Sequence, residues 1–521
     1  MYWCKIARNE SEFEAIAELN YETFVEEIPQ HEQHSSGKRT DAFHHENTYL
    51  IVLKDHQLVG MIALRDQRPF SLDRKIGPVE HALPREALNG KLCEIRLLSV
   101  RKEHRNGRVF FMLARALADY AYEKGYAAAV ISGTVRELKL YGQLGFQAFA
   151  EPVGSEEAAF VPMFLTKERY ERSIAARFQQ KRHMFYPGPN ELTPEIKKAL
   201  QRSPISHRSA EFTERLKRVQ SQLTKMAGAA HVHLLTGSGT LANEAMMAQI
   251  RRLQTTGLVL VNGAFGQRLE SQARRWNLDF ETLEAEWGQP FEFSVVKRHI
   301  ESGSVGWILL AHGETSTGML NGTEELLATC KERKMHVCMD CVSSFGAIPI
   351  DLHDVYLATG VSGKAIGTMS GLAMVFSNHE IIESESIPAY LDLGCYGNGK
   401  IPYTYSSQLV ESLEIALKAY DGNLRYELLE ERYRKLLVAE QNEELSFLTA
   451  LGYPMIVTLK KSRTNKHLAE DARLSGFDLH VQSSYLKERE WVQISIIQPD
   501  FDEAFEKFRL WLSNYREYEK Q

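Results

Sequence analysis

The sequence predicts an α/β protein made of an α+β sheet domain, a larger domain with a mostly parallel sheet, and a small α+β domain at the C-terminal end. Three observations predict this arrangement. Strand-like and helical runs mix irregularly up to about residue 170, they alternate regularly from about residue 231, and a charged stretch followed by Pro187, Gly188 and Pro189 separates the two parts. Strands that alternate with helices at this spacing form crossover units, which build parallel sheets.

The domain boundaries follow from the same pattern. The chain has 521 residues, and at about 150 residues per domain this length corresponds to roughly three folding units. We expect a first domain over residues 1–170, a linker over 171–185, a large domain over 186–430 and a small C-terminal domain over 431–521.

The composition excludes several classes of function. Lys plus Arg number 62 and Asp plus Glu 68, which gives a net charge of −6 with both signs interspersed. Such a chain lacks the single-sign field that binds nucleic acid or an anionic membrane surface, so we expect neither partner. The charged start MYWCKIARNESEF and the lack of any stretch of about 20 apolar residues predict a cytoplasmic protein with no membrane span.

Cysteine usage agrees with a reducing compartment. Six cysteines in a chain of this length are too few for a disulfide framework. Cys338 and Cys341 form a CxxC pair, but no second pair at metal spacing accompanies it, so we expect no metal site.

In the first part, Ser11 and Glu14 match a capping box that begins a helix extending to about Glu27. Strands are expected in TYLIVLKDHQLVGMIALRD, LCEIRLLSV and AAAVISG, and the helix FFMLARALADYAYEKG lies between the last two.

The second part contains three features that suit one cofactor. The strand HVHLL runs into TGSGT and a helix start, where the amides of Ser238, Gly239 and Thr240 would point at an anion, although a plain tight turn explains this fragment equally well. Asp340 ends an apolar strand, where a carboxylate needs a cationic or protonated partner. Lys364 lies in the small-residue loop TGVSGKAIG, where an isolated lysine is usually only solvated. Together they supply the anion site, ring-nitrogen partner and amine that pyridoxal phosphate requires.

At these residues the chain resembles the class V aminotransferases of the alanine–glyoxylate, serine–pyruvate and 2-aminoethylphosphonate group. The resemblance covers about residues 184–521, through FYPGPNEL, SHRSAEFTERL, LTGSGTLANEA, NGAFGQR, AHGETSTGMLN, MDCVSSFGAIPID and SGKAIG. It implies a fold-type I pyridoxal-phosphate transferase that moves an amino group between a small amino donor and a 2-oxo acid or aldehyde. Small-molecule amines and oxo acids would be its partners.

The resemblance also implies roles for individual residues. Lys364 would bind the cofactor covalently and move the substrate proton, and Asp340 would keep the ring nitrogen protonated. Phe265 would stack on the ring with Val342 on its other face, and Thr315 would hydrogen-bond the ring hydroxyl. The phosphate would be bound by Ser238, Gly239, Thr240 and Ser362, and by Tyr403 and Thr404 from the neighbouring subunit of a homodimer.

Two positions depart from the family's pattern. Gly363 precedes the lysine where a phosphate-binding Gln is common. Gln493 in WVQISII stands where an Arg commonly binds the substrate carboxylate, and its neutral donors replace a charged fork. The alternatives are therefore a lyase or desulfurase on the same cofactor, or a scaffold protein that has lost activity.

The first part resembles the GNAT N-acetyltransferase superfamily over residues 1–165, through CEIRLLSV, RKEHRNGRV, the helix that follows and LYGQLGF. The resemblance implies acetyl-CoA or another acyl-CoA as cosubstrate, with Arg105 and Gly107 at the pyrophosphate. Leu98 and Val100 would offer backbone groups to the pantetheine. Tyr141 would protonate the leaving thiolate, and Glu94 would accept the amine proton.

Here too the sequence leaves alternatives. Arg108 and Phe110 occupy positions where the family has small residues. Tyr141 could be a packing tyrosine, and Glu94 an interior charge paired with Arg96, which would make this a catalytically silent docking domain. If both domains are active, we expect them to carry out two steps on one amine.

Overall fold

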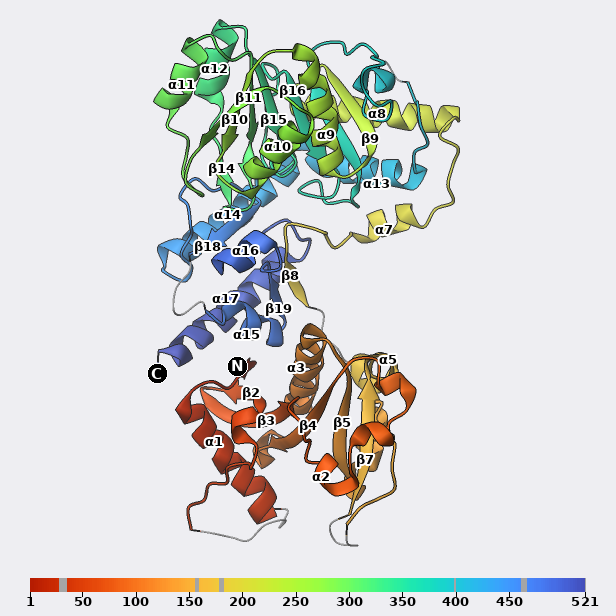
Figure 1. The fold of residues 1–521 in the computed structure, drawn as a ribbon, viewed down its shortest axis with the longest axis vertical. Coiled ribbons are helices and arrows are strands. Elements are labelled where there is room, and N and C mark those ends of the chain that lie inside the picture. The colour runs from red at the N-terminus through yellow and green to blue at the C-terminus, as the bar shows by residue number, and fades with distance from the viewer. Residues whose placement is uncertain (28–34, 155–158, 178–181, 398–399, 461–465, 521) are drawn as a thin grey trace. The chain divides into compact units, whose positions relative to one another are not determined.

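The computed structural model describes residues 1–27, 35–154, 159–177, 182–397, 400–460 and 466–520, and it divides into two compact units (Figure 1). The first unit comprises Met1–His183 together with Thr464–Asp478 and Lys507–Gln521, and the second comprises Met184–Arg463 and Leu479–Glu506. The change of unit after His183 falls within the predicted linker 171–185, of which residues 178–181 lie outside the described residues.

The first unit contains a seven-stranded sheet in the order β1-β2-β3-β4-β5-β7-β6. Its neighbouring strands are antiparallel except for β4 and β5, which are parallel. The strands are β1 (Tyr2–Ile6), β2 (Thr48–Lys54), β3 (Gln57–Arg65), β4 (Lys91–Val100), β5 (Tyr126–Thr134), β6 (Gln147–Ala148) and β7 (Phe160–Thr166). The helices are α1 (Glu10–Tyr21), α2 (Asp73–Ile76), α3 (Arg108–Lys124), α4 (Leu138–Gln143), α5 (Lys167–Arg172) and α6 (Ile174–Arg177). The predicted α+β sheet is therefore present.

The parallel pair β4 and β5 separates partway along its length. Pairing ends at Glu94 and Val130, although both strands continue beyond these residues. Leu97 has a positive φ of 53°, and the register between β3 and β4 shifts at this point. A bulge of this kind bends its strand and increases the local twist. The two strands therefore diverge and leave a split in the sheet.

Helix α1 begins earlier than the sequence predicted. The carboxylate of Glu12 accepts the backbone N–H groups of Arg8 (2.5 Å) and Asn9 (2.9 Å), so Asn9 and Glu12 take the places predicted for Ser11 and Glu14. Asn is as good an N-cap as Ser, and the pattern alone did not rank the two.

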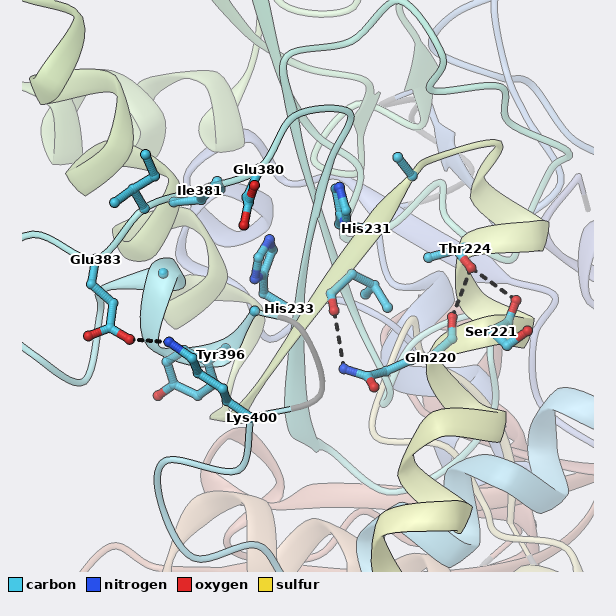
Figure 2. A pocket seen from close by; sticks show the side chains of 15 residues that line it. Gln220, Ser221, Thr224, His231, His233, Glu380, Ile381, Glu383, Tyr396 and Lys400 are labelled. Atoms are coloured by element: carbon cyan, nitrogen blue, oxygen red, sulfur yellow. Dashed lines mark hydrogen bonds and ion pairs between the residues drawn. The ribbon is translucent and has the colours of Figure 1, made fainter.

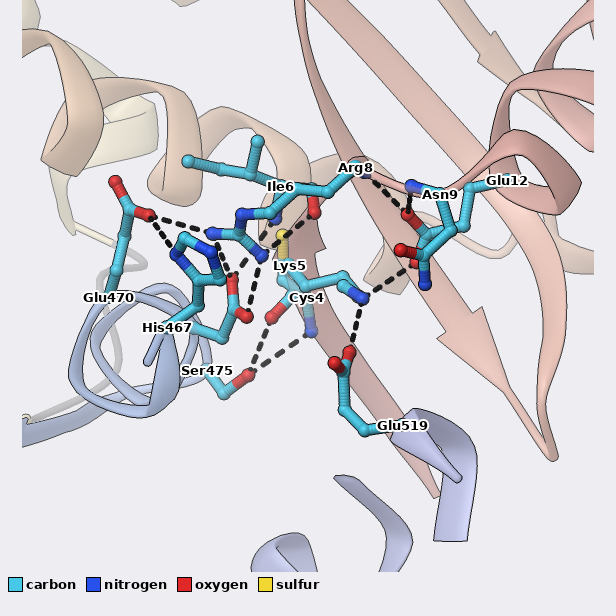
Figure 3. Close-up of polar contacts among 11 residues, drawn as sticks. Cys4, Lys5, Ile6, Arg8, Asn9, Glu12, His467, Glu470, Ser475 and Glu519 are labelled. Carbon is cyan, nitrogen blue, oxygen red and sulfur yellow. Dashed lines mark hydrogen bonds and ion pairs between the residues drawn. The ribbon is translucent and has the colours of Figure 1, made fainter. Parts of the chain in front are cut away.

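Two C-terminal segments belong to the first unit (Figure 3). They are helix α15 (Leu468–Leu474) and the end of α17 (Phe501–Glu519). Lys5 on β1 lies 2.7 Å from Glu12 and 2.6 Å from Glu519, and Arg8 lies 2.8 Å from Asp471. Residues 431–521, expected to form one small domain, are thus shared between the units, because these charges need partners on β1 and α1.

The second unit contains a seven-stranded sheet in the order β11-β10-β12-β15-β16-β17-β9. The strands are β9 (His231–Gly237), β10 (Gly257–Val261), β11 (Phe280–Glu284), β12 (Trp307–Ala311), β15 (His336–Asp340), β16 (Leu357–Val361) and β17 (Gly371–Ser377). Pairing is parallel from β11 to β16, and β17 runs antiparallel to both of its neighbours. This confirms the predicted mostly parallel sheet.

Helices cover both faces of this sheet, because alternate residues of each strand enter opposite cores. Leu258 and Leu260 pack with residues of α8 (Ala210–Ala227), α11 (Phe293–Glu301), α12 (Glu324–Glu332) and α13 (Ser407–Leu417). Val259 and Val261 pack with residues of α9 (Gly239–Ile250) and α10 (Ala264–Arg275). In such a doubly wound sheet, ligands bind beyond the carboxyl ends of the strands.

The remaining elements of the second unit are short or lie outside this sheet. The strands are β13 (Gly313–Glu314) with β14 (Met319–Leu320), and β18 (Ile456–Leu459) with β20 (Val492–Ser495). The helices are α7 (Pro194–Leu200), α14 (Leu424–Gln441) and α16 (Ser484–Arg489), while β8 (His183–Phe185) and β19 (Phe477–Leu479) lie where the chain changes unit. Among the described residues, no helix has the length and apolar character needed to cross a bilayer.

The ion pair of Lys5 with Glu12 should dominate the stability of the first unit. Both side chains are almost fully buried, at 1% and 0% exposure. Lys5→Met leaves Glu12 as a buried charge without a cation, which costs about 3–5 kcal/mol. Hydrogen exchange of the β1 and β2 amides, which reports on opening of this unit, measures the loss. The control is Lys38→Met, whose exposed pair with Glu14 contributes less than about 1 kcal/mol. Equal effects of the two variants would contradict the assignment.

Candidate active site

Lys364 lies on the loop that follows β16, at the carboxyl edge of the second sheet. Its side chain is half-buried, and burial lowers the pKa of its amine to about 8, with Asp340 acting in the opposite direction. Its backbone carbonyl accepts hydrogen bonds from Asn190 Nδ2 (2.6 Å) and from the N–H of Gly367 (2.9 Å). A lysine with a pKa this low is partly neutral at physiological pH, which makes it a nucleophile.

Steric crowding explains why the residue before this lysine is a glycine, Gly363. A Cβ atom at Gly363 would lie 2.0 Å from Ser370 Oγ and 2.8 Å from Ser370 Cα. A Gln cannot be placed there without moving the backbone. Any grip on a phosphate must therefore come from other residues.

Asp340 is the last residue of β15 and is buried. Its Oδ1 accepts the N–H of Val342 (2.9 Å), and its Oδ2 accepts Asn243 Nδ2 (2.8 Å). Asn243 in turn accepts the hydroxyl of Thr359 (2.8 Å) through Oδ1. Burial raises the pKa of Asp340, and these two hydrogen bonds oppose that shift. The relay from Thr359 fixes the orientation of the carboxylate.

The N-terminus of α9 lies beside this carboxylate. Ser238 is its N-cap residue, but the serine side chain makes no capping hydrogen bond. A Cβ on Gly239 would lie 2.8 Å from Val342 Cγ1, so Gly239 lets the helix start approach the strand end closely. Ser238 and Thr240 are exposed. The first amides of the helix thus remain available to an anion, where the helix dipole also attracts negative charge.

Ser362 contributes less than its position suggests. Its hydroxyl donates to the carbonyl of Met369 (2.7 Å) and accepts the N–H of Leu372 (3.3 Å). The hydroxyl therefore holds the turn between β16 and β17.

Phe265 lies at the start of α10 with an arginine stacked on it. The guanidinium of Arg268 lies 4.8 Å from the centre of the Phe265 ring, and Tyr485 approaches that ring edge-on at 6.2 Å. Arg268 is exposed and acts on the pKa values of both Asp340 and Lys364. Among the described residues, no carboxylate lies within ion-pair distance of it.

A buried carboxylate fixes the start of α10. Glu314 accepts the N–H groups of Phe265 (3.3 Å), Gly266 (3.0 Å) and Ser316 (3.1 Å). A Cβ on Gly263 would lie 2.3 Å from Glu314 Cδ, so glycine is required there. Glu314 thereby positions the Phe265 ring.

Gln493 is fully buried and its amide nitrogen is fully used. Nε2 donates to the carbonyls of Thr315 (2.7 Å) and Ser316 (3.2 Å) and to Thr458 Oγ1 (2.8 Å). Its Oε1 has no hydrogen-bond partner in the part of the chain that the structure describes. The Thr315 hydroxyl hydrogen-bonds Tyr453. Gln493 thus leaves no donor for a substrate carboxylate.

Tyr403 and Thr404 lie in the segment before α13. Tyr403 packs against Tyr390 and Tyr396 with ring centres 5.0 and 5.8 Å away, and Thr404 is exposed.

Several residues of the site were not predicted from the sequence. They are Asn190, Asn243, Arg268, Glu314, Tyr453 and His480. Burial lowers the pKa of His480 to about 4, with Lys364 adding to the shift. Only Asn243 had a usable signal, because it follows Gly239 by four residues and so faces the same side of α9.

A separate cavity of about 420 Å³ lies between α8, β9 and the segment that contains Glu380 and Lys400 (Figure 2). Burial lowers the pKa of His233 in its wall to about 4, so this ring is neutral at pH 7. None of the predicted cofactor residues lines this cavity. Within the described part of the chain, no group of three or more His, Cys, Asp or Glu side chains could hold a metal ion.

In the first unit, the split between β4 and β5 opens into a cavity of about 1320 Å³. Leu97 and Leu98 of the bulge and Tyr141 line it. Burial raises the pKa of Tyr141, so the hydroxyl keeps its proton.

Glu94 does not line this cavity. It is 1% exposed, and its carboxylate accepts Ser71 N–H (3.0 Å), Ser71 Oγ (2.5 Å) and Leu72 N–H (3.0 Å). Arg96 Nε is 3.9 Å from it. This arrangement favours the structural role for Glu94 that the sequence left open.

The side chains of the turn that was predicted to bind the pyrophosphate also contact other residues of the first unit. Arg105 donates to the Val100 carbonyl (2.8 Å) and pairs with Glu27 (2.7 Å). Gly107 has a φ of 84° and is the N-cap residue of α3. The guanidinium of Arg108 lies 4.9 Å from the centre of the Tyr2 ring, so it is stacked on that ring.

Two family models match the chain. One, described as aminotransferase class-V, matches residues 195–385, and the other, described as acetyltransferase (GNAT) domain, matches residues 19–115. A 2-aminoethylphosphonate–pyruvate transaminase of Pseudomonas putida (strain F1) is 30% identical over 271 residues, covering 49% of this chain and 72% of that protein. That of Pseudomonas putida strain W619 is 31% identical over 267 residues, 48% of this chain and 71% of its own.

Solved structures share the fold of the second unit. An alanine–glyoxylate aminotransferase from Nostoc sp. matches with a TM-score of 0.58 at 22% identity, covering 65% of this chain and 98% of its own. A cysteine desulfurase from Thermococcus onnurineus matches with a TM-score of 0.51 at 12% identity, covering 63% and 93%. The fold alone therefore does not separate these chemistries.

The fold and the lysine site define a fold-type I transferase of the pyridoxal-phosphate class. Within that class, the chain belongs to the class V aminotransferases, and a GNAT-type domain precedes its aminotransferase part. The predicted family, and the predicted order of a GNAT-like part before a class V aminotransferase part, are confirmed.

Class V aminotransferases use pyridoxal phosphate, and the residues present fit it. The fit rests on a buried Asp340 with a defined orientation, an amine of low pKa on Lys364, and unused amides at the start of α9. When bound, this cofactor supplies an electron sink for the bonds at the substrate carbon. Asp340 would hold the proton on its ring nitrogen, and Lys364 would move the proton at the substrate carbon.

Covalent loading of the cofactor should follow the pKa of Lys364. Only the neutral amine attacks, and at a pKa of about 8 roughly one amine in ten is neutral at pH 7. The rate of attachment to cofactor-free protein, followed by stopped-flow absorbance, should rise with pH and level off above pH 8. Lys364→Ala should abolish attachment and turnover with an unchanged circular dichroism spectrum. A rate that continues to rise to pH 10 would contradict the low pKa.

Removing the Asn243 donor should weaken the hold on the cofactor. A hydrogen bond to a charged group contributes about 1.5–3 kcal/mol, so Asn243→Leu should bind pyridoxal phosphate about ten- to a hundredfold more weakly in a fluorescence titration. Thr359→Val removes only the outer donor of the relay and should cost less than tenfold. Unchanged affinity in Asn243→Leu would show that Asp340 does not depend on it.

Proposed function

We propose that the second unit transfers the amino group of a small amine that bears an anionic group to a 2-oxo acid or aldehyde. The residues that we assign to the cofactor are those predicted from the sequence, with Asn243 added and Ser362 reduced to a structural role. The observation that carries the proposal is Lys364, an amine of low pKa whose electrostatic partner is the buried Asp340. The related transaminases are named for 2-aminoethylphosphonate and pyruvate, which makes this pair the first to test.

Arg268 is our candidate for the residue that binds the donor's anionic group. The donors of Gln493 are used within the protein, whereas Arg268 has no carboxylate partner among the described residues and influences both Asp340 and Lys364. A guanidinium binds carboxylate or phosphonate through two parallel hydrogen bonds.

The desulfurase alternative lacks a nucleophile. Such a mechanism needs a reactive thiol near the lysine, but five of the six cysteines are buried, and the pKa of the sixth, Cys395, is raised by desolvation. The free cysteines also fit the cytoplasmic location that we propose.

We further propose a homodimer in which Tyr403 and Thr404 reach the partner's cofactor. The exposure of Thr404 supports this assignment. For the first unit we propose acyl transfer from an acyl-CoA to an amine. The split between β4 and β5 supports this, because the unpaired edge of β4 can bond the amides of an extended ligand.

Arg268→Gln should raise KM for the anionic donor at least tenfold. The reason is the loss of a charged, bidentate contact, each hydrogen bond of which is worth about 1.5–3 kcal/mol. Steady-state rates with 2-aminoethylphosphonate, alanine, serine and aspartate, each with pyruvate and with glyoxylate, measure the effect. Arg274→Gln on the same helix is the control, because Arg274 pairs with Glu270 at 2.5 Å. If KM is unchanged in Arg268→Gln, another residue binds the anion, and if no donor is consumed, the transamination proposal fails.

A further inference from the structure

The cavity in the first unit reaches both faces of its sheet. One side is lined by apolar residues of α3, among them Phe110, Leu117 and Ala121. The other side is lined by Lys75 of α2 and by Phe160 of β7. Successive residues of β5 confirm that these are different faces, because Ala129 packs in the core with α3 and Ala128 packs in the core with Phe160.

The two sides differ in charge. Lys75 and Arg96 both line the cavity near the start of the split. Within the described residues, Lys75 has no carboxylate at ion-pair distance, and its ammonium lies 4.1 Å from the centre of the Phe160 ring. Arg96 forms an ion pair with Asp41, in which Arg96 Nη2 lies 3.0 Å from Asp41 Oδ2. Glu94, the acid nearest to Arg96 in sequence, is occupied by Ser71 and Leu72. Among the described residues, Lys75 is therefore the cation without an acid at ion-pair distance, whereas Arg96 has Asp41 at 3.0 Å and Glu94 at 3.9 Å.

Some buried polar atoms in the cavity wall also have no hydrogen-bond partner among the described residues. These are Arg96 Nη1, Tyr122 Oη and Ser132 Oγ. A buried polar group without a hydrogen bond costs about 1–3 kcal/mol. Tyr122 belongs to α3 and lies on the side away from Lys75. Arg96 Nη1 and Ser132 Oγ, together with an ammonium that has no acid at ion-pair distance among the described residues, indicate a site for a polar ligand with negative charge.

We propose that the acyl acceptor of the first unit is a small amine that also carries a carboxylate or phosphonate group, and that Lys75 and Arg96 bind this anionic group. The proposal rests on the acyltransferase function proposed above. Lys75 and Arg96 would then hold the acceptor on the side of the sheet opposite α3, with its amine directed into the split. Arg96 is the more rigid of the two, since its guanidinium stacks on Phe43 at 4.6 Å.

The reaction balances without a further reagent. The neutral amine nitrogen forms a bond to the thioester carbonyl carbon, the carbon–sulfur bond breaks, and the amide and a free thiol are the products. The amine loses its proton to solvent, the thiolate takes one from Tyr141, whose raised pKa keeps the hydroxyl protonated, and the tyrosinate regains a proton from solvent. Lys75 and Arg96 take no part in these steps and act through binding.

The test uses the full-length protein, acetyl-CoA and matched amines, with release of free thiol as the readout. We expect kcat/KM for β-alanine and 2-aminoethylphosphonate to exceed that for β-alaninamide and ethylamine at least tenfold. A preference for one anionic amine over the other identifies the group as carboxylate or phosphonate. Lys75→Met should reduce the ratio of anionic to uncharged acceptors at least tenfold through KM, and Lys75→Arg should preserve most of it.

The control is Lys91→Met at the exposed start of β4, which should leave the ratio unchanged. Hydrogen exchange of the β4 and β5 amides in each variant shows that the first unit is folded. Equal rates with charged and uncharged amines, or an unchanged ratio in Lys75→Met, would overturn the anion site but leave acyl transfer standing. If no amine releases thiol, the acyltransferase function itself fails, and the anion site fails with it.

Discussion

The second unit is organised around the carboxylate of Asp340, which can be buried only with hydrogen bonds and nearby positive charges to stabilise it. Asp340 ends a central strand with both oxygens bonded, one to the backbone of Val342 and one to Asn243. The cost of burying it is offset by these bonds and by the charges of Lys364 and Arg268. Because the carboxylate lies at the strand end, the start of α9 and the loop of Lys364 lie at the same edge of the sheet.

That constraint explains why the site could be predicted in part from the sequence. Asp340, Lys364 and the loop at Ser238 each follow a strand, and strand ends of a parallel sheet share an edge. Arg268, Glu314 and His480 could not be predicted in the same way, since their positions depend on how distant segments pack. Gly363 needed the structure too, because only the distance to Ser370 shows why a side chain is excluded.

In the first unit, even more of the site depends on contacts between segments that are distant in the sequence. Its strands were predicted from alternation, but the choice between a catalytic and a structural Glu94 depended on whether Ser71 and Leu72 reach it. Lys75, Asp41 and the bulge at Leu97 carry no sequence motif. The assignment of α15 and the end of α17 to this unit depends on buried ion pairs such as Arg8 with Asp471, and charge pairs between distant segments leave no periodic signal.

The chemistry of the two reactions restricts how one chain can use both units. An amine that has been acylated has its nitrogen lone pair delocalised into the new amide, so it can no longer condense with the aldehyde of the cofactor. The two units therefore compete for any amine that both accept, or they act in sequence with transamination first and acylation of the amine that it forms second. In the sequential case, acylation consumes the amine that transamination forms. Because the equilibrium constant of a transamination is close to one, this removal shifts the reaction toward products. In the competing case, the anionic group that Arg268 and Lys75 are proposed to bind is the part of the shared amine that both units recognise, because it is unchanged by either reaction.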